Sequence, residues 1–474
     1  MSYTRLKDVG EGQMYFLQTR WKQEGKKLRY YGLRNQSELF KNTVRLSGDA
    51  LKIIQKLPCE LSPIEEKKLG KLLGVQIVKK EQLINIPKSL DEARFCKECV
   101  ANDYMIPGIE FDENGLCPMC QTKRETQGLK SVVPIVNTFP KSKKSRFDVA
   151  VFYTGGKDST YLLYYLSKIQ GLRVLAMTWE IPYMSDCAKK SIEGAKRALP
   201  NVEFITRKVS DTHLKTIYRR LYSLSGNTCA CPSLAYVLFY PELVENKVPY
   251  FIAGNEPAQL MGLYYNHMAP KIAYQFGENK FLNGLINVGR VLTLRPPLKK
   301  GQFHALATMK QLAYGDNALK NLAGYRNTLV SNVVKAIHEI PSMVKPLKRA
   351  IRRSSWRGNI PAFVQVDFND ICDGKYDWKK IKDTLISECG WSPPDESFKG
   401  LHTSCKIERC KEHTQFLRFY NMQSDMIPFS ALEISLAVRD GNVSREEGLK
   451  ELKEELGFSL KEIPECQIMR EYFS

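Results

Sequence analysis

A short glycine-rich segment at residues 154–159 combines residue types that suit a bound phosphate. An apolar run, 149–153, leads directly into it, and an amphipathic run, 161–167, follows it at once. This order predicts a buried strand, a tight turn and the start of a helix. Such a turn directs backbone N–H groups and the positive end of the helix dipole at one point. We therefore expect the phosphates of a nucleotide to be held by Thr154, Gly155, Gly156, Lys157, Asp158 and Ser159.

The spacing of this segment differs from that of the Walker loop, because the pattern Gly-x4-Gly-Lys-Ser/Thr is absent. The segment resembles the pyrophosphate loop, Ser-Gly-Gly-x-Asp-Ser, of the ATP pyrophosphatases, and Thr154 replaces its first serine. The resemblance implies an enzyme that transfers AMP from ATP to a carbonyl or carboxylate, releases pyrophosphate, and lets nitrogen or sulfur displace the AMP. It also implies catalytic roles for Lys157 and Asp158, with Asp158 contacting Mg²⁺ or bracing the loop. The alternative is a glycine turn that only joins a core strand to a helix.

The composition predicts a soluble globular protein of two or three domains, since the chain has 474 residues of which 43% are hydrophobic. No segment has the length of a membrane span, and the first residues lack the apolar core of a signal peptide, so we expect a cytoplasmic protein. Thirteen cysteines, several of them clustered, favour metal binding over disulfides in such a compartment.

The formal net charge of +20 favours polyanionic partners, such as nucleic acid, nucleotide sugars or an acidic carrier protein. Part of this charge is concentrated in residues 345–357, which carry six positive charges and Trp356, and in a second basic run at 20–34. A tryptophan among arginines can stack on a base or a sugar. The alternative for both runs is a solvated helix face.

Two Cys-x-x-Cys pairs have the spacing of a structural zinc site. Cys96 and Cys99 form the first pair, Cys117 and Cys120 form the second, and seventeen residues separate the pairs. Each pair is expected to form a knuckle, and together they supply four thiolates to a tetrahedral ion. The alternative is four unrelated reduced cysteines.

The stretch around these cysteines also resembles a known family. The run Cys96-x-x-Cys-Val … Pro-Gly-Ile-x-Phe-Asp … Cys-x-x-Cys120 is similar to the zinc-ribbon start of the N-acetyl sugar amidotransferases of bacterial surface-polysaccharide pathways, where it directly precedes the pyrophosphate loop. Residues 388–391, His402 and residues 434–449 resemble the C-terminal end of that family, so the resemblance spans residue 95 to the end. It implies amidotransfer to an N-acetyl sugar nucleotide. Ammonia would come from a separate glutaminase, because no glutaminase domain is visible.

The pattern along the chain predicts five segments. Residues 1–90 are expected to form a small α+β, winged-helix-like recognition module, weakly similar to the peptide-recognition modules of natural-product maturation enzymes. The others are a zinc ribbon at 91–128, a linker at 129–146, an ATP pyrophosphatase domain at 147–270 and a mostly helical C-terminal lobe at 271–474. A serine followed three residues later by glutamate predicts helix starts at Ser62 and Ser444.

Strands and helices alternate from residue 147 onward, which predicts an α/β domain with a doubly wound parallel sheet. Ligands of such sheets lie at the carboxyl ends of the strands. The resemblance to ATP pyrophosphatases implies that Met177 and Thr178 lie where adenine is held and that Gly254 faces the α-phosphate. The polar residues that follow are candidates to orient substrate, magnesium or ammonia: Asn255, Glu256 and Gln259. The alternatives are core packing for the first pair and a plain loop for the segment after Gly254.

A second cysteine pair indicates different chemistry. Cys229 and Cys231 lie one residue apart beside a proline, after a predicted helix and near the expected crevice. Sugar amidotransferases transfer ammonia and need no thiol. ATP pyrophosphatases that install sulfur use cysteines in this part of the fold, as persulfide carriers or as ligands of an iron–sulfur cluster. Cys405 and Cys410 can complete such a site, and the alternative is packed, inert cysteine.

Three functions are compatible with these features. The first is amidotransfer to an anionic acceptor, a nucleotide sugar. The second is sulfur insertion, which converts an amide to a thioamide in a carrier-bound peptide or thiolates a tRNA base. The third is a zinc-ribbon nucleic-acid-binding protein that only senses nucleotide. His402 and His413 are further candidates for a catalytic or ligand role. The expected cofactors are ATP, Mg²⁺ and Zn²⁺, with an iron–sulfur cluster possible in the second function.

Overall fold

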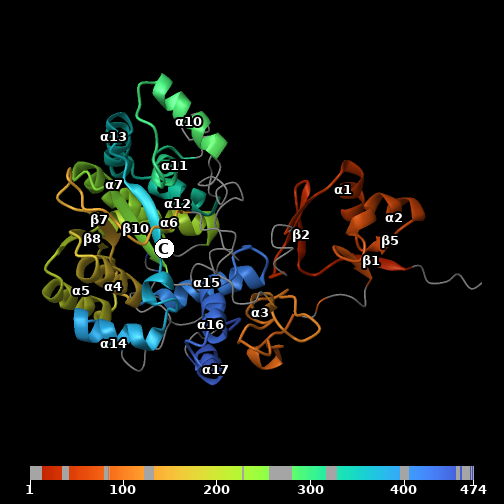
Figure 1. Cartoon of the computed structure of the whole chain (residues 1–474). Helices are drawn as coiled ribbons and strands as arrows, with labels where there is room; N and C mark the ends of the chain where they lie inside the picture. Colours follow the sequence, from red (N-terminus) through yellow and green to blue (C-terminus); the bar gives the residue numbers. More distant parts are fainter. Residues whose placement is uncertain are drawn as a thin grey trace, which may run out of the picture. The chain divides into compact units, whose positions relative to one another are not determined.

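The chain forms two compact units in its computed structural model (Figure 1). One unit contains residues 1–97, 101–122 and 418–427, and the other contains residues 98–100, 123–417 and 428–474. The structure describes residues 13–34, 42–79, 84, 86–121, 133–226, 229–255, 280–315, 328–394, 405–454, 459–461, 470 and 472.

The first unit contains two small antiparallel sheets and two short helices. One sheet has the order β5-β1-β6, formed by β1 (Met14–Leu17), β5 (Cys59–Glu60) and β6 (Ile77–Lys79). The other has the order β2-β3-β4, formed by β2 (Trp21–Glu24), β3 (Lys27–Tyr30) and β4 (Thr43–Arg45). Helices α1 (Gly48–Ile54) and α2 (Pro63–Leu69) share one hydrophobic core with these strands. That core includes Trp21, Leu28, Tyr30, Ile53, Leu69 and Ile77.

Both predicted capping boxes are present. The hydroxyl of Ser62 accepts a hydrogen bond from the N–H of Glu65 at 3.3 Å, and the Glu65 carboxylate accepts one from the N–H of Ser62 at 3.0 Å. Ser444 and Glu447 make the same exchange, at 3.1 and 2.8 Å, at the start of α17 (Arg445–Glu454). These pairs satisfy N–H groups that a helix start leaves without a partner in the helix, so they fix where both helices begin.

The second unit is built on a five-stranded parallel sheet, which confirms the predicted α/β class with a parallel sheet. Its order is β11-β10-β7-β8-β9. The strands are β7 (Val149–Phe152), β8 (Val174–Trp179), β9 (Val202–Arg207), β10 (Tyr250–Asn255) and β11 (Ala362–Asp367). The chain runs outward from β7 through β8 to β9, then returns to the other side of β7. The sequence pattern does not predict β11, which comes from the stretch expected to be mostly helical.

Alternate residues of these strands face two hydrophobic layers. Val149, Val151 and Ala176 belong to the layer of α4 (Lys157–Tyr164), α5 (Asp186–Ala198) and α14 (Trp378–Cys389). Ala150 and Leu175 belong to the opposite layer. Its helices are α6 (Asp211–Ser225), α7 (Ser233–Glu245), α11 (Gln302–Tyr314), α12 (Thr328–Ile337) and α13 (Pro341–Arg357). Helices cover both faces because a parallel sheet is stable only when both are buried.

The remaining helices are α3 (Pro118–Gln121), α10 (Lys280–Leu292), α15 (Glu408–Tyr420) and α16 (Phe429–Arg439). Short 3₁₀ turns lie at Gly70–Leu72, Leu90–Glu92 and Asp370–Cys372, and a π-helical turn, Tyr165–Ile169, continues α4. Across the described ranges, no helix has both the length and the apolar character that crossing a membrane requires.

Candidate functional site

The predicted phosphate loop lies between β7 and α4, at the carboxyl edge of the sheet. Strand β7 is the first strand of the sheet, and it pairs with β8 on one side and β10 on the other. The strand order therefore reverses at β7. In doubly wound sheets this reversal is the point at which ligands bind, so residues 154–159 occupy the position expected of a ligand site.

Gly155 fixes the course of the loop. Its φ is +76°, a conformation that residues with a side chain rarely adopt. A Cβ atom on Gly155 would lie 2.5 Å from the carbonyl oxygen of Ala188 in α5. The indole N–H of Trp391 donates a hydrogen bond to the carbonyl oxygen of Gly155 at 3.1 Å. The loop backbone is thus held between α5 and Trp391, and only glycine fits at this position.

Two hydroxyl groups connect the ends of the loop. Thr154 Oγ1 and Ser159 Oγ lie 3.3 Å apart, and Ser159 Oγ donates to the carbonyl oxygen of Gly156 at 3.1 Å. Gly156 is the N-cap of α4, and no side chain hydrogen-bonds to this helix end as a cap. The positive end of the helix dipole is therefore not offset by a capping side chain. Together these groups can bind an anion through hydroxyl and backbone donors.

Lys157 and Asp158 face aromatic side chains from a distant part of the chain. Lys157 Nζ lies 2.7 Å from Asp158 Oδ1 and 2.9 Å from the hydroxyl oxygen of Tyr376. The same ammonium lies 4.6 Å from the ring centre of Tyr376 and 4.7 Å from that of Trp378. The Tyr376 hydroxyl donates to Asp158 Oδ1 at 2.5 Å. Lys157 and Asp158 thus bind the same Tyr376 hydroxyl, and the catalytic roles expected for both residues stay predictions.

The residues expected near adenine are buried beside the loop. The Met177 side chain is 1% exposed and belongs to the hydrophobic core, while its carbonyl oxygen accepts a hydrogen bond from the N–H of Tyr153 at 2.9 Å. The hydroxyl of Thr178 donates to the carbonyl oxygen of Tyr153 at 2.9 Å. The Met177 side chain thus packs in the core and the Thr178 hydroxyl holds the end of the strand, while a place for adenine beside them stays a prediction.

Gly254 brings α4 close to the sheet. A Cβ atom there would lie 2.9 Å from side-chain atoms of both Leu162 and Phe368. The backbone of Asn255 pairs with that of Asp367, whose carboxyl has a pKa raised by burial. Asp367 ends β11 at the same edge as the loop, and the sequence pattern does not identify it as a candidate. The Asn255 side chain, Glu256, Gln259 and His402 lie outside the described residues.

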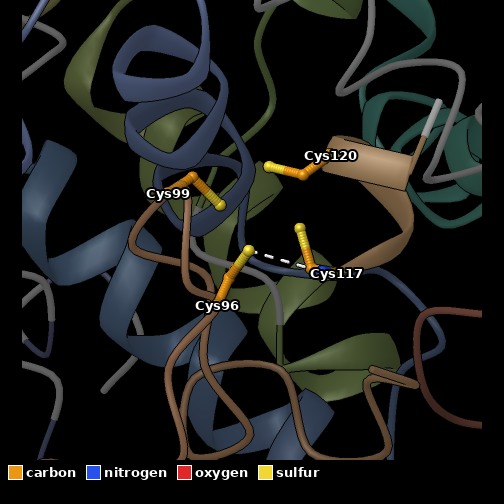
Figure 2. A group of neighbouring side chains, drawn as sticks. All are labelled: Cys96, Cys99, Cys117 and Cys120. Atoms are coloured by element: carbon orange, nitrogen blue, oxygen red, sulfur yellow. Dashed lines mark hydrogen bonds between the residues drawn. The ribbon is translucent and has the colours of Figure 1, made fainter. Parts of the chain in front are cut away.

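The four zinc-ribbon cysteines form one cluster (Figure 2). Their sulfur atoms all lie within 4.8 Å of one another, and Cys96, Cys99 and Cys117 are fully buried. The N–H of Cys117 donates to Cys96 Sγ at 3.3 Å. Four thiolates at these separations fit a tetrahedral zinc ion, in which Zn–S bonds of about 2.3 Å place the sulfurs about 3.8 Å apart. The cluster can therefore hold a metal ion such as zinc, in which case the N–H···S bond would orient a ligand sulfur.

The second cysteine pair is partly accessible. Cys229 is half-buried, Cys231 is exposed, and the N–H of Cys231 donates to Cys229 Sγ at 3.3 Å. A hydrogen bond from the Cys231 thiol lowers the pKa of Cys229 to about 7, burial opposes this shift, and the Lys411 ammonium assists it. The pKa of Cys231 is raised well above its usual value, chiefly because its thiol donates that bond. Cys229 is thus the thiol of the pair whose ionised form the hydrogen bond favours.

The Cys229 pair lies toward the same edge of the sheet as the phosphate loop. Helix α7 leads directly into β10, so its amino end, beside Cys231, lies toward the carboxyl edge. Cys405, which acts electrostatically on both thiols, forms a β-bridge with Met184 just after β8. Lys406 Nζ pairs with Asp186 at 3.1 Å, at the start of the helix that contacts Gly155.

The remaining candidates of that region have structural partners. Cys410 is 1% exposed and packs with Tyr183 and Ile407. His413 is buried, and its Nε2 lies 2.8 Å from the carbonyl oxygen of Ser459. Within the described residues, one group of three or more His, Cys, Asp or Glu side chains has the spacing of metal ligands, and it is the zinc-ribbon cluster. Cys229, Cys231, Cys405 and Cys410 do not meet that criterion together.

We predict that Gly155→Ala destabilises the fold far more than Gly171→Ala. Both glycines have positive φ, +76° and +61°, but a Cβ on Gly171 would meet no atom within 4 Å. Gly171→Ala, the control variant, should lose about 1 kcal/mol of unfolding free energy from backbone strain alone. Gly155→Ala should lose roughly 2 kcal/mol more through overpacking against Ala188. Equal losses for the two variants in chemical denaturation would contradict the close approach of the loop to α5.

We predict one zinc ion per chain, bound by Cys96, Cys99, Cys117 and Cys120. Cys96→Ser should reduce the zinc content measured by mass spectrometry and lower the unfolding free energy by roughly 2 kcal/mol or more, because metal-binding energy contributes to folding. Cys59→Ser, at a half-buried cysteine outside the cluster, is the matched control and should retain the metal. Stoichiometric zinc and unchanged unfolding in the Cys96→Ser protein would show that this cluster is not the metal site.

Comparison with known proteins does not assign this chain to a family. No protein-family model matches the chain, and no curated protein matches it. Three features of the chain itself bear on its function. They are the glycine loop at the strand reversal, the cluster of four cysteines, and the Cys229/Cys231 pair on which the Lys411 charge acts.

Proposed function

We propose that this chain is an enzyme of the ATP pyrophosphatase type that transfers AMP from ATP to a carbonyl or amide oxygen and then replaces that oxygen with nitrogen. The observation that carries the proposal is the loop at residues 154–159. It joins the first strand to an uncapped helix at the reversal of strand order, and its glycine cannot be replaced without a collision. The start of α4 has no side-chain cap, so its backbone N–H groups can bind a phosphate.

In the proposed reaction, the acceptor oxygen attacks the α-phosphorus of ATP, and the bond to the β-phosphate breaks. The charge that develops on the leaving pyrophosphate would be stabilised by the hydroxyls of Thr154 and Ser159 and by the positive end of α4. Ammonia then attacks the activated carbon, and AMP leaves with the former acceptor oxygen. No side chain of this chain needs to form a covalent bond in the nitrogen version.

Lys157 and Asp158 would support this site by holding the loop in place. Their contacts with Tyr376 and Trp378 keep the start of α4 fixed, which is what a preorganised anion site requires. Mg²⁺, when bound, would neutralise charge on the phosphates. The carboxylates at this edge of the sheet, Asp158 and Asp367, are its candidate ligands, because Mg²⁺ prefers carboxylate oxygens.

We take an N-acetyl sugar nucleotide as the leading acceptor. Two segments that resemble the sugar amidotransferases pack against the catalytic unit: Trp391 hydrogen-bonds to Gly155, and Ala437 belongs to the hydrophobic layer of α4. The net charge of +20 suits an acceptor that carries phosphates. Ammonia would come from a separate glutaminase.

Sulfur insertion is the second candidate, and the state of Cys229 favours it. A partly accessible thiol whose pKa is lowered by a hydrogen bond from a second thiol and by the Lys411 charge is suited to carry a persulfide. The pair also lies toward the edge at which the loop binds ATP in our proposal. The product would be a thioamide on a carrier-bound peptide or a thiolated tRNA base.

Ser159→Ala should lower pyrophosphate release by about a hundredfold, because it removes one of the hydroxyls that we propose to stabilise the leaving pyrophosphate. The assay contains ATP, Mg²⁺, ammonium and a nucleotide-linked N-acetyl sugar. Ser167→Ala is the matched control, since Ser167 donates only to the Leu163 carbonyl within the helical segment. Full activity of Ser159→Ala, or formation of ADP and phosphate as the products, would contradict the proposal.

A Cys229→Ser/Cys231→Ser protein should separate the two candidate functions. Serine stays protonated at neutral pH, so it can neither carry persulfide sulfur nor form a thiolate. If the enzyme is an amidotransferase, we expect the double variant to retain nitrogen transfer. Cys187→Ser is the control variant and should retain it as well. A folded double variant that still releases pyrophosphate but forms no product would favour sulfur insertion instead.

A further inference from the structure

Helix α10 turns its apolar side outward. Phe281, Leu285, Val288 and Leu292, spaced as one face of a helix, are between 58% and 81% exposed. The opposite face contains Arg290, which is only 6% exposed and donates to the carbonyl oxygens of Pro296 and Ser355 at 2.8 and 3.1 Å. A surface helix normally buries its apolar face and exposes its polar one. The orientation of α10 is the reverse.

Specific polar contacts hold α10 in this orientation. Asn287, on the inner face, accepts a hydrogen bond from the N–H of Leu298 at 2.7 Å and donates to the carbonyl oxygen of the same residue at 3.3 Å. With the bonds of Arg290 to Pro296 and Ser355, these contacts attach the helix to the segment that follows it and to α13. A contiguous exposed apolar patch of this kind usually marks a surface that binds a partner.

The outer face of α13, next to α10, is strongly basic. Lys345, Arg349, Arg352 and Arg353 lie on one exposed face of the helix. At its end Trp356 is 55% exposed, and the Arg295 guanidinium lies 5.2 Å from its ring centre. This is the basic run noted in the sequence.

Acidic residues are almost absent from this part of the chain. Residues 280–315 and 328–357 contain thirteen lysines and arginines and a single acidic residue, Glu339. Glu339 is paired with Arg220 of α6, at 3.0 Å. Within these two described ranges, a row of apolar side chains on α10 is therefore accompanied by a large excess of positive charge.

We propose that the outer faces of α10 and α13 bind the surface of an anionic phospholipid bilayer. The apolar row of α10 would enter the boundary between headgroups and acyl chains, and the arginines of α13 would contact lipid phosphates. Nucleic acid offers phosphates but leaves the apolar row of α10 in water. A second copy of the chain would bring two strongly positive surfaces together, which is unfavourable. The inference is independent of the adenylation chemistry proposed above.

The test is sedimentation of the full chain with vesicles of phosphatidylcholine alone and with vesicles that contain equal parts of phosphatidylcholine and phosphatidylglycerol. We expect binding to the anionic vesicles only, and weaker binding at high salt. Arg352→Gln/Arg353→Gln should weaken it by roughly tenfold or more, since each basic residue near an anionic surface contributes about a factor of five. Leu285→Asp/Val288→Asp should abolish it.

The matched control is Lys196→Gln/Arg197→Gln, which removes two exposed positive charges from α5, on the opposite face of the sheet. It should bind as the unaltered chain does, because its charges do not belong to the patch. All variants replace exposed side chains, and their unfolding curves should match that of the parent.

Three outcomes would overturn the proposal. The first is equal loss of binding in the α5 control, which would indicate net charge without a specific surface. The second is binding to a duplex oligonucleotide that competes with vesicles and is unaffected by Leu285→Asp/Val288→Asp, which would make nucleic acid the partner. The third is a dimer in light scattering that those same substitutions dissociate, which would make a second copy the occupant of α10.

Discussion

The backbone of Gly155 lies so close to the first turn of α5 that no side chain fits between them. This approach sets the course of residues 154–159, and the rest of the candidate site depends on it. Trp391 holds the same residue through a hydrogen bond from its indole N–H to the Gly155 carbonyl oxygen. Lys157 and Asp158 then fix the start of α4 against Tyr376 and Trp378. A site for a highly charged ligand needs donors that are already in place, since reorganising them would cost binding energy.

Local pattern predicts the parts of this site that are close in sequence. The apolar run before Thr154 and the amphipathic run after Ser159 predict the strand, turn and helix, because each depends on neighbouring residues alone. The spacing of Cys96, Cys99, Cys117 and Cys120 predicts their cluster for the same reason. The two capping boxes, at Ser62 and Ser444, follow from side chains three residues apart.

The parts that were not predicted depend on contacts between distant residues. Tyr376 and Trp378 surround an ammonium more than two hundred residues earlier in the chain, and no local pattern marks them. Strand β11 pairs with β10 and adds Asp367 to the edge, although most of its neighbours in sequence are helical. The reversed orientation of α10 is set by Arg290 and its partners near α13, whereas periodicity reveals only that the helix is amphipathic. Nor does the sequence pattern show that the side chains of Met177 and Thr178 are committed to the core and to the strand end.

The glycine loop and the Cys229/Cys231 pair both lie toward the carboxyl edge of the sheet. This placement is compatible with either candidate function, nitrogen transfer or sulfur insertion. In our proposal the loop would bind the phosphates of ATP for adenylation, and the thiol of Cys229 would carry sulfur in the second candidate function. The first step is common to both, because nitrogen and sulfur alike must displace AMP from an oxygen that has already been activated. The cysteines would then determine only whether nitrogen or sulfur displaces AMP in the second step. The cluster of Cys96, Cys99, Cys117 and Cys120 would contribute to neither proposed step directly, since the first three of these cysteines are fully buried.

The central claim is that AMP is transferred to an oxygen of the acceptor, and an isotope label on that oxygen tests it most directly. The acceptor carbonyl is labelled with heavy oxygen, turned over with unlabelled ATP, and the nucleotide product is analysed by mass spectrometry. We expect AMP that carries one labelled oxygen, whether nitrogen or sulfur replaces that oxygen in the acceptor. Unlabelled AMP, or ADP together with labelled phosphate, would contradict it.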